Sequence, residues 1–172
     1  MSQGLGGAHL SLPSPFGFLH VWLDEDLRGV DRWGKESSGA VTRLQIVSDS
    51  SFESRDTKLG RTVSKLLNEY LAGDLEAIDE IAVAQLGTGF RQEVWLAMRS
   101  IEAGTTDSYA GLAQRARRSQ AFRAAASACS NNAIPLIVPC HRVITSSGAI
   151  GNYYYGTDLK INLLQHEGAL KA

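Results

Sequence analysis

Residues 134–144, Ile-Pro-Leu-Ile-Val-Pro-Cys-His-Arg-Val-Ile, constrain this chain more than any other stretch. A short apolar run rich in β-branched residues is typical of a buried strand, so we expect a strand over 134–138. Pro139 has no N–H to donate and would end regular strand pairing. We therefore expect Cys140 at the end of a rigid strand, at the edge of the core.

The two residues after Cys140 favour chemistry at its thiol. Positive charge from His141 and Arg142 would lower the pKa of the thiol toward the reactive thiolate. Alternatively, Cys140 is a buried cysteine that packs as a small apolar side chain, with His141 and Arg142 as polar groups at a strand end. The spacing alone leaves both interpretations open.

Composition places the chain among globular proteins. Its 172 residues, 44% of them hydrophobic, can build one domain or two small ones. The two cysteines, Cys129 and Cys140, are too few for a disulfide framework and indicate a reducing compartment. Residues 1–7 lack the basic start and apolar core of a signal peptide, and no stretch approaches about 18 apolar residues. We expect a cytoplasmic protein, or a nuclear one in a eukaryote, with no membrane contact.

The charge is unevenly distributed along the chain. Residues 1–87 carry 8 Lys and Arg against 13 Asp and Glu, a net charge of −5, whereas residues 88–172 carry 9 against 5, a net charge of +4. No acidic residue lies between Asp107 and Asp158. That span contains Arg115, Arg117, Arg118, Arg123 and Arg142. Such a stretch is expected where nucleic-acid phosphates are bound, although a solvated helix face has the same composition.

The N-terminal half is expected to be a small α/β unit without chemistry of its own. Residues 10–33 are predicted to form a hairpin of two strands, with Asp24 to Asp26 as its turn. Residues 41–47 predict a further strand, and the polar residues 48–56 a loop. Helical spacing over 59–71 predicts a helix, capped by Asp56 or Thr57 and ended by Gly73. Residues 74–86 form a connector that could add a strand.

Three helices are predicted after a boundary at Gly87-Thr88-Gly89. Thr88 can cap the first, and Thr106 or Ser108 starts the second. Ser119 can cap the third, over 120–130, and two short helices joined by a tight turn form a helix-turn-helix pattern. The third helix is alanine-rich with Arg123 as its one long cation, so its small face either packs on a neighbouring helix or approaches a nucleic-acid groove.

The C-terminal residues supply a possible catalytic carboxylate. Tyr153-Tyr154-Tyr155 could form a wall on which a flat ring stacks, or finish a strand. A last helix is predicted around Leu159, Leu163 and Leu164. Glu167 is the only acid after Asp158 and is the natural candidate to orient His141. A base held by a carboxylate beside a thiol has the logic of a nucleophilic triad.

Read together, these motifs resemble the O6-alkylguanine-DNA alkyltransferases, also called methylated-DNA–protein-cysteine methyltransferases. The likeness covers residues 66–168 well and the N-terminal half loosely. Its most specific part is Pro139-Cys140-His141-Arg142-Val143. The supporting pieces are Tyr70-Leu-Ala-Gly, Gly87-Thr88-x-Phe90-x-x-x-Val94-Trp95, Ser108-Tyr109, Arg123-Ala124, Asn132, Gly151-Asn152-Tyr153 and Leu163-Leu164-x-x-Glu167.

The resemblance implies a ribonuclease-H-like α/β domain over 1–86 and a winged-helix-like, mainly α domain with a helix-turn-helix over 87–172. Cys140 would accept the alkyl group of O6-alkylguanine, and that of O4-alkylthymine, in one irreversible transfer, with His141, Glu167 and a water drawing off its proton. Asn132 would brace the turn before the active-site strand. The implied DNA contacts come from Arg123, which fills the gap left by the flipped base, and from Tyr109, Ala124, Ser127, Arg115 and Arg118. The implied guanine pocket comprises Tyr109, Val143, Tyr153, Tyr154 and Tyr155.

The implied partner is double-stranded DNA carrying the lesion, bound by a monomer that can cluster on DNA. No cofactor and no metal are expected, because the zinc ligands of some relatives are not recognisable. Ala124-Ala125-Ala126 follows Arg123 where relatives often have Ala-Val-Gly, and Ala133 stands where a proline is common. Tyr155 replaces a frequent glycine and is expected to narrow the pocket.

Two other functions fit parts of the sequence. A helix-turn-helix module that only senses alkyl lesions would have no need of the Cys140 thiol. A cysteine hydrolase using Cys140, His141 and Glu167 would turn over repeatedly on small esters or amides, whereas an alkyltransferase stops after one event. The acid-free basic span and the helix-turn-helix pattern favour the alkyltransferase.

Overall fold

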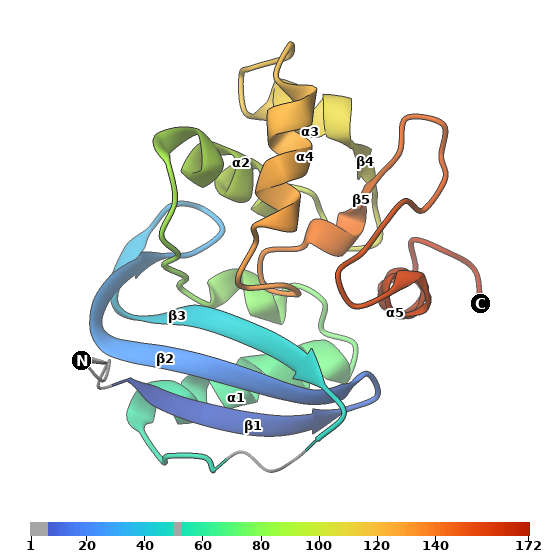
Figure 1. Cartoon of the computed structure of the whole chain (residues 1–172). Helices are drawn as coiled ribbons and strands as arrows, with labels where there is room; N and C mark the ends of the chain where they lie inside the picture. Colours follow the sequence, from blue (N-terminus) through green and yellow to red (C-terminus); the bar gives the residue numbers. More distant parts are fainter. Residues whose placement is uncertain (1–6, 50–52) are drawn as a thin grey trace. The chain divides into compact units, whose positions relative to one another are not determined.

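The computed structural model describes residues 7–49 and 53–172, and the chain divides into two compact units, residues 1–85 and 86–172 (Figure 1). Residues 1–6, most of the segment in which no signal peptide is expected, lie outside the described residues. Residues 50–52 of the predicted loop lie outside them as well. Residues 53–56, which complete that loop, have no regular secondary structure. No helix among the described residues is long and apolar enough to cross a membrane.

The first unit is an antiparallel sheet with a helix across one face (Figure 1). Its elements are β1 (Ala8–Ser14), β2 (Gly17–Val30), β3 (Glu36–Val47), α1 (Lys58–Leu71) and the 3-10 helix η1 (Ala77–Glu80). Alternate strand residues point inward, which buries Leu10, Leu12, Leu19, Val21, Leu23, Leu44 and Ile46. In the connector after α1, Val83 bridges to both Val30 and Val41.

The predicted turn at Asp24 to Asp26 is wrong, because β2 continues through it. The pairing of β2 with β3 shifts register between Asp24 and Arg28, so these residues form a bulge. Asp24 Oδ1 accepts hydrogen bonds of 3.0 Å from the N–H groups of Asp26 and Leu27, which satisfies the backbone locally and lets the strand resume. The chain turns instead after Asp31, whose Oδ1 accepts from the N–H groups of two later residues at 2.9 Å.

The predicted helix of this unit is confirmed, with its cap. Thr57 Oγ1 accepts a 3.0 Å hydrogen bond from Gly60 N–H at the start of α1. The helix buries Val63, Leu66, Leu67 and Tyr70 against the sheet. It ends before Gly73, whose φ of 110° is a conformation that glycine adopts without strain.

The second unit is mainly helical, with one short parallel strand pair. Its elements are α2 (Gly89–Arg99), β4 (Asp107–Ser108), α3 (Tyr109–Arg115), α4 (Phe122–Ser130), the 3-10 helix η2 (Cys140–Arg142), β5 (Val143–Ile144) and α5 (Thr157–His166). Helices α2, α3 and α4 pack on one another, and β4 pairs with β5 (Figure 1). Trp95 Nε1 donates a 2.9 Å hydrogen bond to Ala128 O and so ties α2 to α4.

The predicted caps of the first two helices are confirmed, and that of the third is wrong. Thr88 and Ser108 accept from the N–H groups of Arg91 and Gly111. Helix α4 begins only at Phe122, and its N-cap residue, Ala121, makes no side-chain hydrogen bond. The residues before it instead form a turn in which Ala121 N–H donates to Arg118 O at 2.8 Å.

The predicted strand over 134–138 is also wrong. The run is buried, but its hydrogen bonds are local: Val138 N–H donates to Ile134 O, and Cys140 N–H donates to Val138 O, both at 2.9 Å. Pro135 and Pro139 offer no N–H to a ladder, and Leu136 has a φ of 72°, which no strand residue adopts. The apolar run is therefore a compact turn, and Cys140 begins a helical turn instead of ending a strand.

Replacing Thr57 with Ala should lower the free energy of unfolding of the first unit by about 1 kcal/mol, because Gly60 N–H loses its cap. Denaturant unfolding followed by circular dichroism measures this. Thr62→Ala, on an exposed turn of the same helix, is the matched control and should be neutral or slightly stabilising. Equal losses in both variants would contradict the capping role.

Candidate active site

The turn that carries Cys140 is held from both ends. Asn132 Nδ2 donates to Val138 O at 2.7 Å, and Asn132 Oδ1 accepts from Ile134 N–H at 3.0 Å. One side-chain amide thus clamps the two ends of the apolar turn. The turn leads directly into η2, which presents Cys140, His141 and Arg142 in sequence.

A buried carboxylate organises the residues after the thiol. Glu167, the C-cap residue of α5, accepts from Arg142 Nε through Oε2 and from Arg142 Nη2 through Oε1, both at 2.9 Å. Its Oε1 also lies 2.9 Å from His141 Nε2. Arg142 Nη1 donates to Ile101 O at 2.6 Å, so the guanidinium is fixed on two sides. The side chains of all three residues are almost completely inaccessible to solvent.

The protonation states follow from these contacts. Burial by itself would raise the pKa of Glu167, but the pairing with His141 and Arg142 outweighs it and holds that pKa far below its usual range. Burial lowers the pKa of His141, against the opposing effect of Glu167, and the nearby cations lower it further. His141 is therefore a neutral imidazole whose Nε2–H donates to an ionised Glu167.

This tautomer leaves the other imidazole nitrogen as a proton acceptor. His141 Nδ1 is buried and makes no hydrogen bond to any group in residues 7–49 or 53–172. With Nε2 protonated and directed at Glu167, the Nδ1 lone pair is available. A neutral imidazole next in sequence to a thiol, oriented from behind by a carboxylate, has the arrangement of a general base.

The Cys140 thiol is protonated at rest. Burial raises its pKa, and hydrogen bonding from Asn132 and Tyr153 and the charge of Lys160 oppose that effect without reversing it. The prediction that His141 and Arg142 lower this pKa is wrong. His141 is neutral, and the Arg142 charge is paired with Glu167. The thiol therefore needs a base to become a nucleophile.

Sequence reasoning missed Lys160. This α5 residue is buried, and its Nζ donates a 2.6 Å hydrogen bond to Val143 O. Burial lowers the pKa of Lys160, while the Cys140 and Cys129 thiols oppose that shift, so the ammonium lies within electrostatic reach of both sulfur atoms. Its spacing with Leu163, Leu164 and Glu167 places it on the inward face of α5, a signal the sequence offered.

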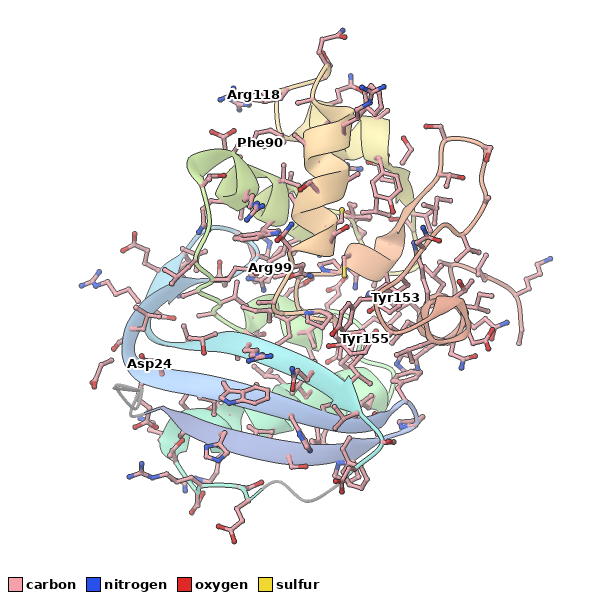
Figure 2. All side chains as sticks on the ribbon, in the orientation of Figure 1. Asp24, Phe90, Arg99, Arg118, Tyr153 and Tyr155 are labelled. Atoms are coloured by element: carbon pink, nitrogen blue, oxygen red, sulfur yellow. The ribbon has the colours of Figure 1, made fainter. Side chains whose placement is uncertain are left out.

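The tyrosines lie on the segment before α5 and at the start of α3. The Tyr153 and Tyr155 rings are 5.9 Å apart between centroids and tilted by 58° (Figure 2). No strand includes residues 153–155; Tyr154 is 88% exposed, with its ring edge-on to Tyr155. Tyr109 is half-buried, and its pKa is raised by burial and by the Cys129 and Cys140 thiols. Val143, directly after η2, is fully buried.

Helix α4 has a buried side and an exposed side. Ala125 and Ala128 pack inward, whereas Arg123, Ala124 and Ser127 are exposed. Small residues occupy both faces of α4. The buried face can therefore pack on a neighbouring helix while the exposed face approaches a nucleic-acid groove.

The two other predicted DNA contacts already have partners. Arg115 Nε lies 2.5 Å from Asp107 Oδ2, and Arg118 Nε lies 3.8 Å from Glu93 Oε2. The Arg118 guanidinium also lies 5.8 Å from the centre of the Phe90 ring (Figure 2). No group of three His, Cys, Asp or Glu side chains that could hold a metal occurs among the described residues.

Replacing Glu167 with Gln should destabilise the second unit by roughly 3–5 kcal/mol, because Arg142 is left as a buried unpaired charge. Thermal unfolding at pH 7 measures the loss. Glu93→Gln removes a carboxylate from an exposed ion pair of the same unit and should cost about 1 kcal/mol or less. A loss no larger than that of the control would contradict the central role of Glu167.

Acidification should destabilise this unit. The folded-state pKa values of Glu167 and His141 both lie below their unfolded values, so the unfolded chain binds more protons as the pH falls. The contribution of His141 is complete above about pH 6.5 and that of Glu167 above about pH 4.3, and each is lost below. Melting temperatures measured from pH 8 down to pH 3 should decrease once the pH drops below about 6.5, and decrease further below about 4.3. A profile that is flat or rises on acidification would contradict these assignments.

The residues of this site lie within the part of the chain that matches a known protein family. Residues 89–169 match the family model described as 6-O-methylguanine DNA methyltransferase, DNA binding domain. The chain is 43% identical over 162 residues to the methylated-DNA–protein-cysteine methyltransferase of Salmonella typhimurium and 38% identical over 162 residues to that of Shigella flexneri. Both alignments cover 92% of this chain and 94% of the relative.

Structural similarity extends over nearly the whole chain. The crystal structure of Mycobacterium tuberculosis OGT in complex with DNA matches with a TM-score of 0.74 at 28% identity, covering 94% of this chain and 92% of that one. The mixed α/β character of the fold is confirmed by this likeness, and the family resemblance by the two relatives. The chain therefore belongs to the methylated-DNA–protein-cysteine methyltransferase family.

Proposed function

We propose that this chain repairs DNA by moving the alkyl group of O6-alkylguanine, and of O4-alkylthymine, onto the Cys140 sulfur, once per molecule. The observation that carries the proposal is the protonated Cys140 thiol beside a neutral His141, whose Nε2–H is held by Glu167. Family membership supplies the substrate class. Because the product is a thioether, the acceptor is not regenerated.

The proposed step balances without a cofactor. The Cys140 thiol passes its proton toward His141 Nδ1, directly or through a water, and the sulfur attacks the alkyl carbon. A carbon–sulfur bond forms as the carbon–O6 bond breaks, and the electron pair returns to the guanine, which takes up a proton. Glu167 stabilises the imidazolium that forms, as carboxylates do in nucleophilic triads.

A base stacked inside a duplex is beyond the reach of the Cys140 thiol, so the damaged nucleotide must leave the stack, at a cost of a few kcal/mol. The small exposed face of α4, with Ala124 and Ser127, suits a close approach to the minor groove. Arg123 would occupy the gap left by the base, and Tyr109 would lie beside the extruded nucleotide. Arg115 and Arg118 would contact phosphates, partly screened by their carboxylate partners.

The pocket for the extruded guanine would be lined by Tyr109, Val143, Tyr153, Tyr154 and Tyr155. Tyr154 would contribute its backbone, since its side chain is 88% exposed. Tyr155, which lies against both neighbouring tyrosine rings, would set the width of the pocket.

The finer architecture belongs to the same proposal. We assign residues 1–86 to a ribonuclease-H-like domain and residues 87–172 to a winged-helix-like domain in which α3 and α4 form the helix-turn-helix. The protein would act as a monomer that can cluster on DNA, in the cytoplasm or in a eukaryotic nucleus. No cofactor enters the proposed step.

Intact mass measured after incubation with duplex DNA containing O6-methylguanine should rise by one methyl group per chain. Cys140→Ala should abolish the gain, whereas Cys129→Ala, the matched cysteine variant, should retain it. Lesion binding without mass gain would indicate a sensor. Absence of both, with repeated turnover of small esters, would indicate a hydrolase.

Tyr155→Gly should raise the rate of transfer from a benzyl adduct about tenfold or more and leave methyl transfer nearly unchanged, because the wider pocket relieves a clash felt only by the larger group. Single-turnover rates on the two duplexes measure this. Tyr155→Phe preserves the ring and should behave as wild type. If the benzyl-to-methyl rate ratio is the same in wild type and Tyr155→Gly, Tyr155 does not limit the pocket.

A further inference from the structure

Phe122 is a large aromatic side chain in an unusual position. It is the first residue of α4, and 48% of it is exposed. An aromatic ring of this size normally contributes to stability by being buried. The half-exposed ring, next to the predicted DNA-penetrating arginine, is therefore available for contacts outside the core.

The Phe122 ring and the Arg123 guanidinium lie close to each other. The Arg123 guanidinium carbon lies 5.7 Å from the centre of the Phe122 ring, a distance at which a cation is attracted to the face of an aromatic ring. No ion pair joins Arg123 to a carboxylate within residues 7–49 and 53–172. Phe122 and Arg123 thus project as a pair from the beginning of the helix.

The rest of α4 leaves this pair prominent. Every other residue of the helix is Ala, Ser or Cys, so Phe122 and Arg123 extend further from the helix than the other exposed side chains. The base of the pair is rigid, because Ala125 and Ala128 are fully buried and Trp95 Nε1 holds Ala128 O. The first turn continues without a break from the preceding loop, since Ala125 N–H donates to Ala121 O at 2.9 Å.

The surroundings match the charge of DNA. Arg117 and Arg118 lie in the loop that leads into α4, and no acidic residue occurs from 108 to 157. Minor-groove proteins commonly insert an apolar wedge between base steps, supported by cations on the phosphates. An exposed ring with Arg123 over its face, and with Arg117 and Arg118 in the preceding loop, has that composition, although Arg118 also lies 3.8 Å from Glu93.

We propose that Phe122 and Arg123 act as a two-part wedge on damaged duplex DNA, in which Arg123 fills the vacated position and the Phe122 ring stacks on the adjacent base pair. The inference rests on the proposed function, because it needs a base to leave the stack. The ring would hold open the step next to the lesion and slow the return of the extruded nucleotide. Phe122 touches the substrate and takes no part in proton or alkyl transfer.

If Phe122 acts as a wedge, removing its ring should lower the rate of transfer from duplex substrates only. Because the alanine variant loses the stacking contact with a base, Phe122→Ala should slow single-turnover transfer from an O6-methylguanine duplex about tenfold. Transfer from the free base O6-methylguanine, which needs no base extrusion and carries the same alkyl group as the duplex, should be unchanged. Phe122→Trp keeps a stacking ring and should restore the duplex rate. Leu96→Ala removes another exposed apolar side chain of the same unit and should affect neither substrate.

A second measurement separates this inference from the proposed function. A duplex with 2-aminopurine beside the lesion reports local unstacking when Cys140→Ser, which cannot transfer the group, binds it. The fluorescence change should be lost in the double variant that combines Cys140→Ser with Phe122→Ala. Equal duplex rates in wild type and Phe122→Ala, or equal losses on duplex and free base, would overturn the wedge. Failure of wild type on both substrates would instead overturn the proposed function, and the fluorescence comparison would still decide on Phe122.

Discussion

The active-site unit depends on one buried carboxylate. Glu167 accepts two hydrogen bonds from Arg142 and one from His141, and all three side chains are shielded from solvent. A buried charge is tolerated only when it is paired and fully hydrogen-bonded, so this cluster has little freedom to rearrange. It joins the end of α5 to η2, and through Ile101 O it reaches the segment after α2. The same contacts that stabilise the unit set the tautomer of the base.

The electrostatics at Cys140 suit the proposed role of a single-use alkyl acceptor. Burial keeps Cys140 protonated, which limits its reaction with stray electrophiles. His141 can remove the proton because its own charge is suppressed by burial and its orientation is fixed by Glu167. In the proposed reaction, the thiol becomes nucleophilic only when an alkylated base reaches the pocket. Lys160, buried on α5, adds positive charge near the sulfur while its Nζ donates to Val143 O.

Local patterns in the sequence predicted most elements correctly. Thr57, Thr88 and Ser108 cap their helices because capping involves only residues three positions apart. The turn predicted at Asp24 is wrong because an aspartate that accepts from the following N–H groups forms a turn in one setting and a bulge in another, and strand pairing decides which. The strand predicted over 134–138 is wrong because burial and β-branching do not distinguish a strand from a buried turn. Two prolines and the Asn132 clamp favour the turn.

The sequence by itself identified the thiol, the imidazole and the family resemblance, because these depend on residue types at short, ordered spacings. It also singled out Glu167, by elimination, as the partner of His141. Only the tertiary structure decided that Arg142 neutralises Glu167 and leaves the thiol protonated, and that Lys160 turns inward. Those outcomes depend on contacts between residues 17 to 41 positions apart and on desolvation, which changes the charge state of each group. No local pattern encodes the burial that sets a pKa.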